Sequence, residues 1–172
     1  MNEDTEDAPR RLKRGSPRKR LWIAAAGVAI IAGIAAFLLL RDTGPELPPA
    51  TKNATFPIYY PTQPPGSFAV DTNKINYDPA TGILFMTLKN VYDQDVSITQ
   101  QAMPSQLNFD SMKGNGDLID GIEGKAVVGG VEGRVVATMV GKENKTLILI
   151  NTRTASKEDV KKIVASLHRV RH

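Results

Sequence analysis

A run of twenty residues without a charged side chain, which begins at Leu21 and ends at Leu40, constrains this chain more than any other feature. An α-helix rises about 1.5 Å per residue, so such a run spans about 30 Å, the thickness of the hydrocarbon core of a bilayer. Inside lipid, a helix satisfies the hydrogen bonds of its own backbone. The sequence therefore predicts a transmembrane helix over residues 21–40, with the lipid bilayer as its partner.

The charges on either side of this run predict its orientation. Residues 1–20 hold seven basic and four acidic side chains, whereas only Arg41 and Lys52 are basic within a comparable distance after the run. Basic flanking residues stay on the cytoplasmic side of a membrane. We therefore expect a single-pass protein of the cell membrane, with a basic cytoplasmic tail over residues 1–20 and an extracytoplasmic C-terminal domain.

A cleaved signal peptide is the alternative interpretation of the same run. Signal peptides have apolar cores of about 7–15 residues followed by a small-x-small cleavage site. Here the apolar run is longer and ends in three leucines and an arginine, and the chain lacks the cysteine that a lipoprotein signal needs. These features favour retention of the helix.

The predicted membrane helix carries a ridge of small residues, Ala25, Ala29 and Gly33, that would let two such helices approach closely. A homodimer through the membrane helix is therefore a further hypothesis.

A stalk and one folded domain are expected after the membrane. Residues 41–55 are rich in proline, which predicts an extended stalk, and aromatic residues return at Phe56, so the domain is expected over residues 56–172. The nearly continuous apolar run at 83–88 places apolar side chains on both faces of a strand, which predicts a central strand that is covered on both faces. Short apolar runs between turn residues predict antiparallel strands at 67–70, 74–77, 83–89, 96–101, 125–129, 134–140 and 146–151.

The end of the chain carries the clearest helix signal outside the membrane. Ser156 and Asp159 have the spacing of a capping box. Apolar residues then repeat at helical spacing, at Val160, Ile163, Val164 and Leu167. The fold class expected is therefore α+β: an N-terminal transmembrane helix, then an antiparallel β-sheet domain with a C-terminal helix packed on one face.

One long connection interrupts this pattern. Residues 103–123 contain three glycines and few apolar residues, which predicts a loop with one short element. Loops of this length are uncommon in compact domains and often carry function. We therefore expect part of the contact surface for an envelope protein or ligand here, and a disordered insertion is the alternative. The residues expected to contact the partner are Lys113, Asn115, Asp117 and Asp120.

No residue pattern in the sequence indicates catalysis, a metal site or a cofactor. The two histidines, His168 and His172, lie at the C-terminus, where a frayed end would hold neither a catalytic triad nor a metal ion. After the predicted membrane helix the chain has 15 basic and 14 acidic residues, a balance that argues against nucleic-acid binding. Four carboxylates in the long connection lack the spacing of an EF-hand, so a solvated acidic loop is favoured over a calcium site: Asp110, Asp117, Asp120 and Glu123.

Residues 56–167 resemble a known family. The sequence FPIYYP at 56–61, Pro65-Gly66, a meander, GKA at 124–126 and IVASL at 163–167 resemble the extracytoplasmic domain called domain of unknown function 4367. Ser67-Phe68 departs from its pattern, where a tyrosine commonly follows the glycine. The resemblance implies a membrane-anchored bacterial domain without enzymatic activity, found in some regulators of envelope stress. A second likeness, to the photosystem protein PsbP and its bacterial lipoprotein relatives, implies a similar sheet with a helix on it.

Together these features predict a membrane-anchored, non-enzymatic binding or regulatory module of the cell envelope, without a cofactor. Two alternatives stay open. The first is a structural subunit of an envelope or secretion complex. The second is an envelope enzyme whose site the sequence does not reveal.

Overall fold

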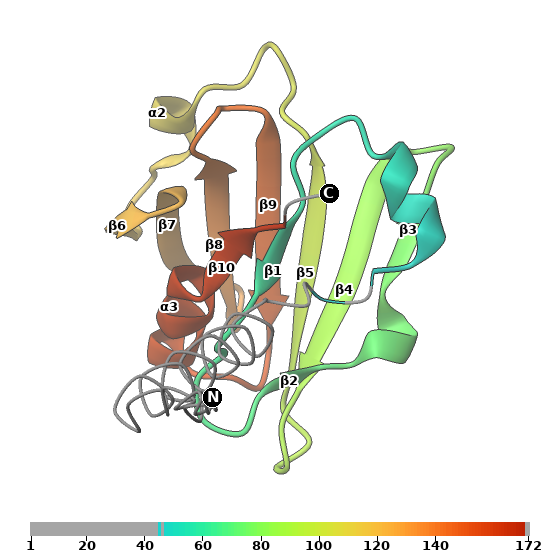
Figure 1. Ribbon diagram of the computed structural model, residues 1–172. Coiled ribbons are helices and arrows are strands. Elements are labelled where there is room, and N and C mark those ends of the chain that lie inside the picture. Colours follow the sequence, from blue (N-terminus) through green and yellow to red (C-terminus); the bar gives the residue numbers. More distant parts are fainter. Residues whose placement is uncertain (1–44, 46, 171–172) are drawn as a thin grey trace, which may run out of the picture. The chain divides into compact units, whose positions relative to one another are not determined.

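The structure, a computed structural model, describes residue 45 and residues 47–170 (Figure 1). The predicted cytoplasmic tail, the predicted transmembrane helix over residues 21–40 and the start of the predicted stalk lie outside the described residues. Among the residues that are described, no helix is long and apolar enough to cross a membrane. The fold below is that of the C-terminal unit, which runs from Gly44 to His172.

An eight-stranded antiparallel sheet forms the body of this unit, in the order β2-β4-β5-β9-β8-β7-β6. Strand β3 also pairs with β4, so two short strands share one edge of the sheet. The mainly antiparallel sheet with a C-terminal helix confirms the predicted α+β class. The strands are β2 (Ala69–Val70), β3 (Asn76–Asp78), β4 (Ile83–Lys89), β5 (Asp95–Ala102), β6 (Asp117–Ile122), β7 (Gly124–Val131), β8 (Arg134–Gly141) and β9 (Thr146–Thr152).

The connection from β5 to β6 must pass three strands, because β9, β8 and β7 lie between its ends. It contains the single-turn helix α2 (Phe109–Met112), which begins after Asn108, whose side-chain oxygen accepts a hydrogen bond from the backbone N–H of Ser111. The predicted loop over residues 103–123 is therefore wrong at its C-terminal end. Residues 117–122 form the edge strand β6, whose short apolar stretch gave no clear alternation.

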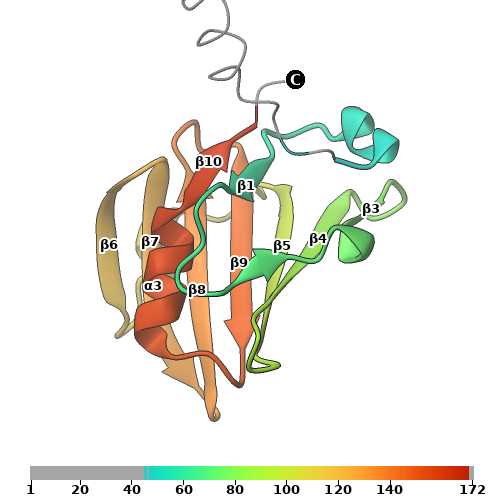
Figure 2. The same cartoon turned by 60° about the horizontal axis from the view of Figure 1, so that its bottom comes forward.

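Helix α3 (Lys157–Ala165) lies across β6, β7 and β8 on one face of the sheet (Figure 2). The predicted capping box is confirmed, because the Ser156 hydroxyl and the Asp159 carboxylate each accept a hydrogen bond from the other residue's backbone N–H. Val160, Ile163 and Val164 are fully buried in the main hydrophobic core. The core therefore lies between this helix and the inner face of the sheet.

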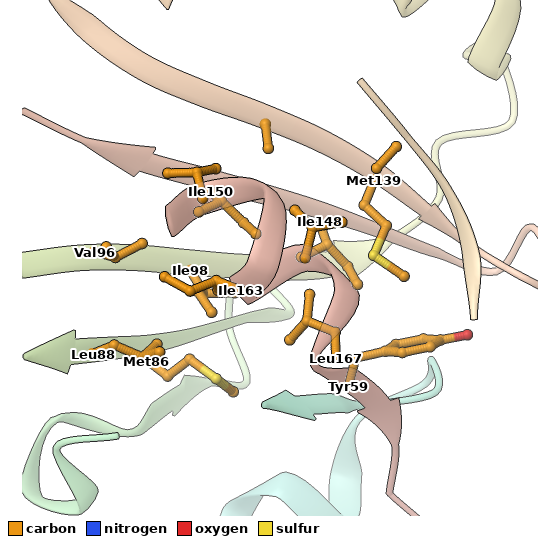
Figure 3. Close-up of a cluster of buried hydrophobic side chains, with 14 of the residues drawn as sticks. Tyr59, Met86, Leu88, Val96, Ile98, Met139, Ile148, Ile150, Ile163 and Leu167 are labelled. Atoms are coloured by element: carbon orange, nitrogen blue, oxygen red, sulfur yellow. The ribbon is translucent and has the colours of Figure 1, made fainter. Parts of the chain in front are cut away.

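A two-stranded ribbon, β1 (Tyr59–Pro61) with β10 (Leu167–Arg169), lies on the same side of the sheet as α3 (Figure 2). Leu167 was expected to end the apolar stripe of the helix. It instead begins β10, because the helix ends at Ala165, and its side chain is fully buried in the core beside Tyr59 (Figure 3). The ribbon thus closes one end of the core.

Strand β4 is covered on one face only, which corrects the prediction of a strand buried on both sides. Leu84, Met86 and Leu88 are fully buried in the core, whereas Phe85 is 44% exposed on the opposite face. The apolar residues on the other face of this strand, Ile83 and Phe85, are therefore left half-buried and exposed instead of being covered by the core.

The predicted stalk extends too far at its C-terminal end. Residues 49–53 form the 3-10 helix η1 (Pro49–Asn53), which lies beside β3. Proline at the first position of a helical turn costs no hydrogen bond, so this composition suits a helix start as well as an extended segment. Thr51 is buried, and its hydroxyl donates to the carbonyl of Pro48 at 2.7 Å. A second 3-10 helix, η2 (Thr72–Lys74), separates β2 from β3.

Candidate functional site

An open groove of about 870 Å³ lies between residues 54–57, the turn from β8 to β9, and strand β10. Part of its lining is apolar, from Ala54, Pro57 and Val170. The charged side chains of the lining come from three separate segments: Glu123, Lys142, Glu143, Lys145 and Arg169. An apolar surface beside a mixed set of charges suits a ligand that has both an apolar and a charged part.

Hydrogen bonds to backbone carbonyl groups bring these distant segments together. The Thr146 hydroxyl donates to the carbonyl of Pro57 at 2.7 Å, which joins β9 to the start of the domain. The N–H of Val170 donates to the carbonyl of Ile58 at 2.8 Å. The N–H of Lys142 donates to the carbonyl of Glu123 at 2.9 Å. The groove is therefore built on paired backbone and not on free loops.

The acidic side chains of the groove already have partners within the domain. Glu143 lies 3.3 Å from the Lys145 ammonium and is also paired with the Arg169 guanidinium, and its pKa is lowered mainly by the hydrogen bond from Lys145. Glu123 accepts the backbone N–H of Arg169 at 2.6 Å. Lys142 has no carboxylate partner among the described residues. The lining therefore holds one cation that is available to an anionic ligand.

Tyr59 contributes a neutral hydroxyl to the lining of the groove. Its side chain is almost fully buried, and burial raises the pKa of the phenol. Gly141 packs against this ring so closely that a Cβ atom there would lie 2.5 Å from the phenol oxygen. Because Gly141 has no side chain, the Tyr59 ring has room to reach the groove.

The structure does not bring the four sequence-predicted contact residues together. Lys113 pairs with Asp110 at 2.5 Å and lies over the ring of Phe109, within the connection itself. Asp117 lies 3.1 Å and 2.8 Å from the ammonium groups of two α3 lysines, Lys157 and Lys161.

Asn115 is exposed, and the side chain of Asp120 lies outside the described residues. None of the four predicted residues lines the groove. Two of them, Lys113 and Asp117, are occupied in holding α2 and β6 in place. The exposed part of the predicted contact surface is therefore small.

Sequence reasoning missed the groove and misjudged one of its neighbours. His168 was expected in a frayed terminus, but it lies in β10 opposite Tyr60, with its Nδ1 atom 3.4 Å from Glu123. His172 lies outside the described residues. The charged turn over residues 142–145 was the available signal, but nothing in the sequence shows that it meets residues 123 and 169.

No group of three or more histidine or acidic side chains is placed to hold a metal ion within the described part of the chain. Among the described residues, the side-chain partner of His168 is the carboxylate of Glu123, not a serine or threonine hydroxyl. The arrangement supplies charges and hydrogen-bond donors for binding.

Comparisons with known protein families, with curated proteins and with solved structures find no match for this chain. The site is therefore interpreted from its own geometry. The resemblance of residues 56–167 to domain of unknown function 4367 stays an expectation.

Proposed function

We propose that this chain is a single-pass membrane protein whose C-terminal domain acts outside the cytoplasm as a non-catalytic binding or regulatory module of the cell envelope. The uncharged run over residues 21–40 and its basic N-terminal flank support the anchor and its orientation. The observation that carries the binding role is the groove, in which segments distant in sequence gather an apolar surface and paired charges. The resemblance to domain of unknown function 4367 points to the same class of protein.

The lining of the groove favours a ligand with an anionic group next to an apolar part. Lys142 supplies a cation without a carboxylate partner among the described residues, and the neutral Tyr59 hydroxyl supplies a hydrogen-bond donor. Ala54, Pro57 and Val170 supply apolar contact. The carboxyl terminus of a peptide with small apolar side chains has this chemistry, and we take it as the probe.

The experiment compares a short apolar peptide that has a free carboxyl terminus with the same peptide amidated at that end. Backbone amide shifts of the unit over residues 44–172 are followed by NMR during each titration. We expect the free-acid peptide to shift the amides of Lys142 and Val170, and the amidated peptide to leave them unchanged. The variant Lys142→Glu should remove this binding, whereas Lys74→Glu on η2 should retain it. Equal binding of both peptides, or binding that survives Lys142→Glu, would refute recognition of an anion in the groove.

A structural subunit of an envelope complex is the second candidate, and the turn from β4 to β5 favours it. Val91 and Tyr92 are 77% and 79% exposed at its tip. Asn90 holds the turn, because its side-chain oxygen accepts the backbone N–H groups of Tyr92 and Gln94, each at 3.0 Å. The Gln94 side chain donates in turn to the carbonyl of Thr154 at 2.7 Å.

A pre-ordered, exposed tyrosine loses little entropy when it binds a partner protein. Tyr92→Ala should therefore leave the melting temperature of the domain unchanged. If the chain is a subunit, the same variant should release it from its membrane complex on a native gel, and a control variant at an exposed residue of η2, Lys74→Ala, should not. A complex of unchanged size would count against the subunit role of this tip.

A further inference from the structure

The Glu123 carboxylate holds a backbone donor at the groove. In the β1–β10 ribbon the hydrogen bond between the strands joins Val170 to Ile58, so the N–H of the preceding residue, Arg169, points away from β1. Glu123, between β6 and β7, accepts this N–H through its Oε2 at 2.6 Å. Both residues line the groove. A carboxylate of the domain itself therefore closes this edge of β10.

The available cation of the groove is a neighbour of the same carboxylate. The backbone N–H of Lys142 donates to the carbonyl of Glu123 at 2.9 Å. The phenol of Tyr59 is close as well, because burial raises its pKa most and the negative charge of Glu123 raises it further. Glu123 thus lies among the donors that the proposed anionic ligand would use, which are the Lys142 ammonium, the Tyr59 hydroxyl and the Arg169 N–H.

The two acidic residues of the groove differ in how firmly they are held. Glu143 is paired with two cationic side chains, Lys145 and Arg169. Among the described residues, no lysine or arginine side chain pairs with Glu123, whose side-chain partner is His168 at 3.4 Å. The Glu123 side chain is 41% exposed, so it can turn into water when another acceptor takes the Arg169 N–H. Of the two, Glu123 is therefore the carboxylate that a ligand can replace.

We propose that Glu123 is a built-in competitor of the ligand, because its carboxylate occupies the Arg169 N–H that the anionic group of the ligand takes on binding. This inference rests on the proposed function, the binding of an anionic and partly apolar ligand in the groove. The bound anion lies between the Lys142 ammonium and the Arg169 N–H. The Glu123 carboxylate then faces solvent.

A competitor of this kind determines which anions the groove accepts. A small anion only exchanges one carboxylate for another at the Arg169 N–H, and the charge of Glu123 repels it from Lys142. A ligand with an apolar part also gains contact with Pro57 and Val170, which the hydrogen bond from Val170 to Ile58 holds next to Arg169. The groove therefore selects ligands that carry both parts.

Substitution separates the charge of Glu123 from its hydrogen bond. Glu123→Gln removes the charge but keeps an oxygen that accepts the Arg169 N–H, so the ribbon should stay attached, and the melting temperature checks this. Glu132→Gln is the matched control, because Glu132 is exposed in the turn between β7 and β8, at the other end of these strands. The full-length proteins are purified in detergent, and fluorescence anisotropy measures the binding of the short apolar peptide with a free or an amidated carboxyl terminus.

We expect Glu123→Gln to bind the free-acid peptide several-fold more tightly than the natural chain does, because a like charge is removed from the position of the ligand's anion. The amidated peptide should gain nothing from this substitution. Glu132→Gln should bind both peptides as the natural chain does. Equal or weaker binding of the free-acid peptide by folded Glu123→Gln would overturn the proposal and leave Glu123 as a residue that only fastens β10.

A second measurement uses the natural chain and so does not depend on the folding of a variant. The side-chain carboxyl carbon of Glu123 is followed by NMR while each peptide is added to the full-length protein. Its resonance should shift as the free-acid peptide binds, because the carboxylate loses the Arg169 N–H, and it should not move with the amidated peptide. An unchanged resonance at saturation with the free-acid peptide would overturn the proposal.

The same titrations separate this proposal from the proposed function. If the natural chain prefers the free-acid peptide but Glu123→Gln binds it no more tightly, the competitor is overturned while the binding role of the groove stands. If neither the natural chain nor Glu123→Gln prefers the free-acid peptide, both proposals fail.

Discussion

The side-chain amide of Gln100 makes the two hydrogen bonds with the backbone of Tyr59 that a neighbouring strand would otherwise make. Its Oε1 accepts the backbone N–H of Tyr59 at 2.9 Å, and its Nε2 donates to the carbonyl of the same residue at 2.6 Å. Tyr59 lies opposite Arg169 at a non-hydrogen-bonded position of the ribbon, because the neighbouring bond joins Val170 to Ile58. Both backbone groups of Tyr59 therefore point toward the sheet, and one fully buried glutamine of β5 satisfies them.

Replacing this glutamine by leucine should destabilise the domain strongly. Gln100→Leu keeps a similar volume but leaves two buried backbone groups without partners, at about 1–3 kcal/mol each. We expect a loss of about 2–5 kcal/mol in the free energy of unfolding, measured by urea denaturation at unchanged slope. Gln101→Leu, on the outer face next to it, is the matched control and should change stability by less than about 0.5 kcal/mol. Similar effects for the two variants would show that the ribbon is held by side-chain packing alone.

The sheet was largely predictable from the sequence, whereas the ribbon was not. Residues 83–89 and 146–151 are short apolar runs bounded by turn residues, so their predicted ends agree with β4 and nearly with β9. Strands β1 and β10 have three residues each, too few for any periodicity, and they pair across more than a hundred residues of chain. A single buried glutamine determines where the ribbon attaches, and no local pattern marks it.

The glycines of β7 offer a test of backbone packing. A Cβ atom at Gly124 would lie 2.1 Å from the carbonyl oxygen of Val140, a backbone atom that cannot move without shifting β8. A Cβ atom at Gly130 would come no closer than 3.8 Å to any neighbour. Gly124→Ala should therefore lower the free energy of unfolding by several times the effect of Gly130→Ala, which should stay below about 1 kcal/mol. Thermal unfolding followed by circular dichroism measures both, and equal effects would contradict the close approach of β7 and β8.

The candidate site was less predictable than the fold, because its charges pair across elements. Asp117 was predicted to face a partner, but it binds two lysines of α3, forty residues further along the chain. The sequence shows the charges of both segments. It does not show that β6 becomes an edge strand beneath the helix, and that placement decides the role of the carboxylate.

This carboxylate predicts a pH dependence of stability. Hydrogen bonds from Lys161 and then from Lys157 lower the pKa of Asp117 from its ordinary value of 3.8. The Asp117 carboxylate therefore binds a proton more readily in the unfolded chain than in the folded one. Its lysine pairs stabilise the fold fully above pH 3.8, and this stabilisation is lost as the pH falls through the lower pKa of the folded state. Asp117→Asn should lower the melting temperature slightly at neutral pH, and the difference from the natural chain should shrink below about pH 3 and in high salt.

The control for that experiment is Asp93→Asn, because Asp93 is almost fully exposed and lies 3.7 Å from Lys89. Such pairs contribute little. A melting difference for Asp117→Asn that persists unchanged at low pH would show that its lysine pairs are not the cause.

The orientation in the membrane is the prediction on which the proposed function depends most. Because basic residues precede the run that begins at Leu21, protease added to intact cells should remove the C-terminal domain and leave a fragment that carries the N-terminal tail. Cleavage is expected before Pro49, because η1 and the residues after it belong to the folded unit. Immunoblots against tags at both ends measure the outcome, with lysed cells as the control for protease activity. A protected domain together with digestion of residues 1–20 would show the opposite orientation, and the charge asymmetry would then require another explanation.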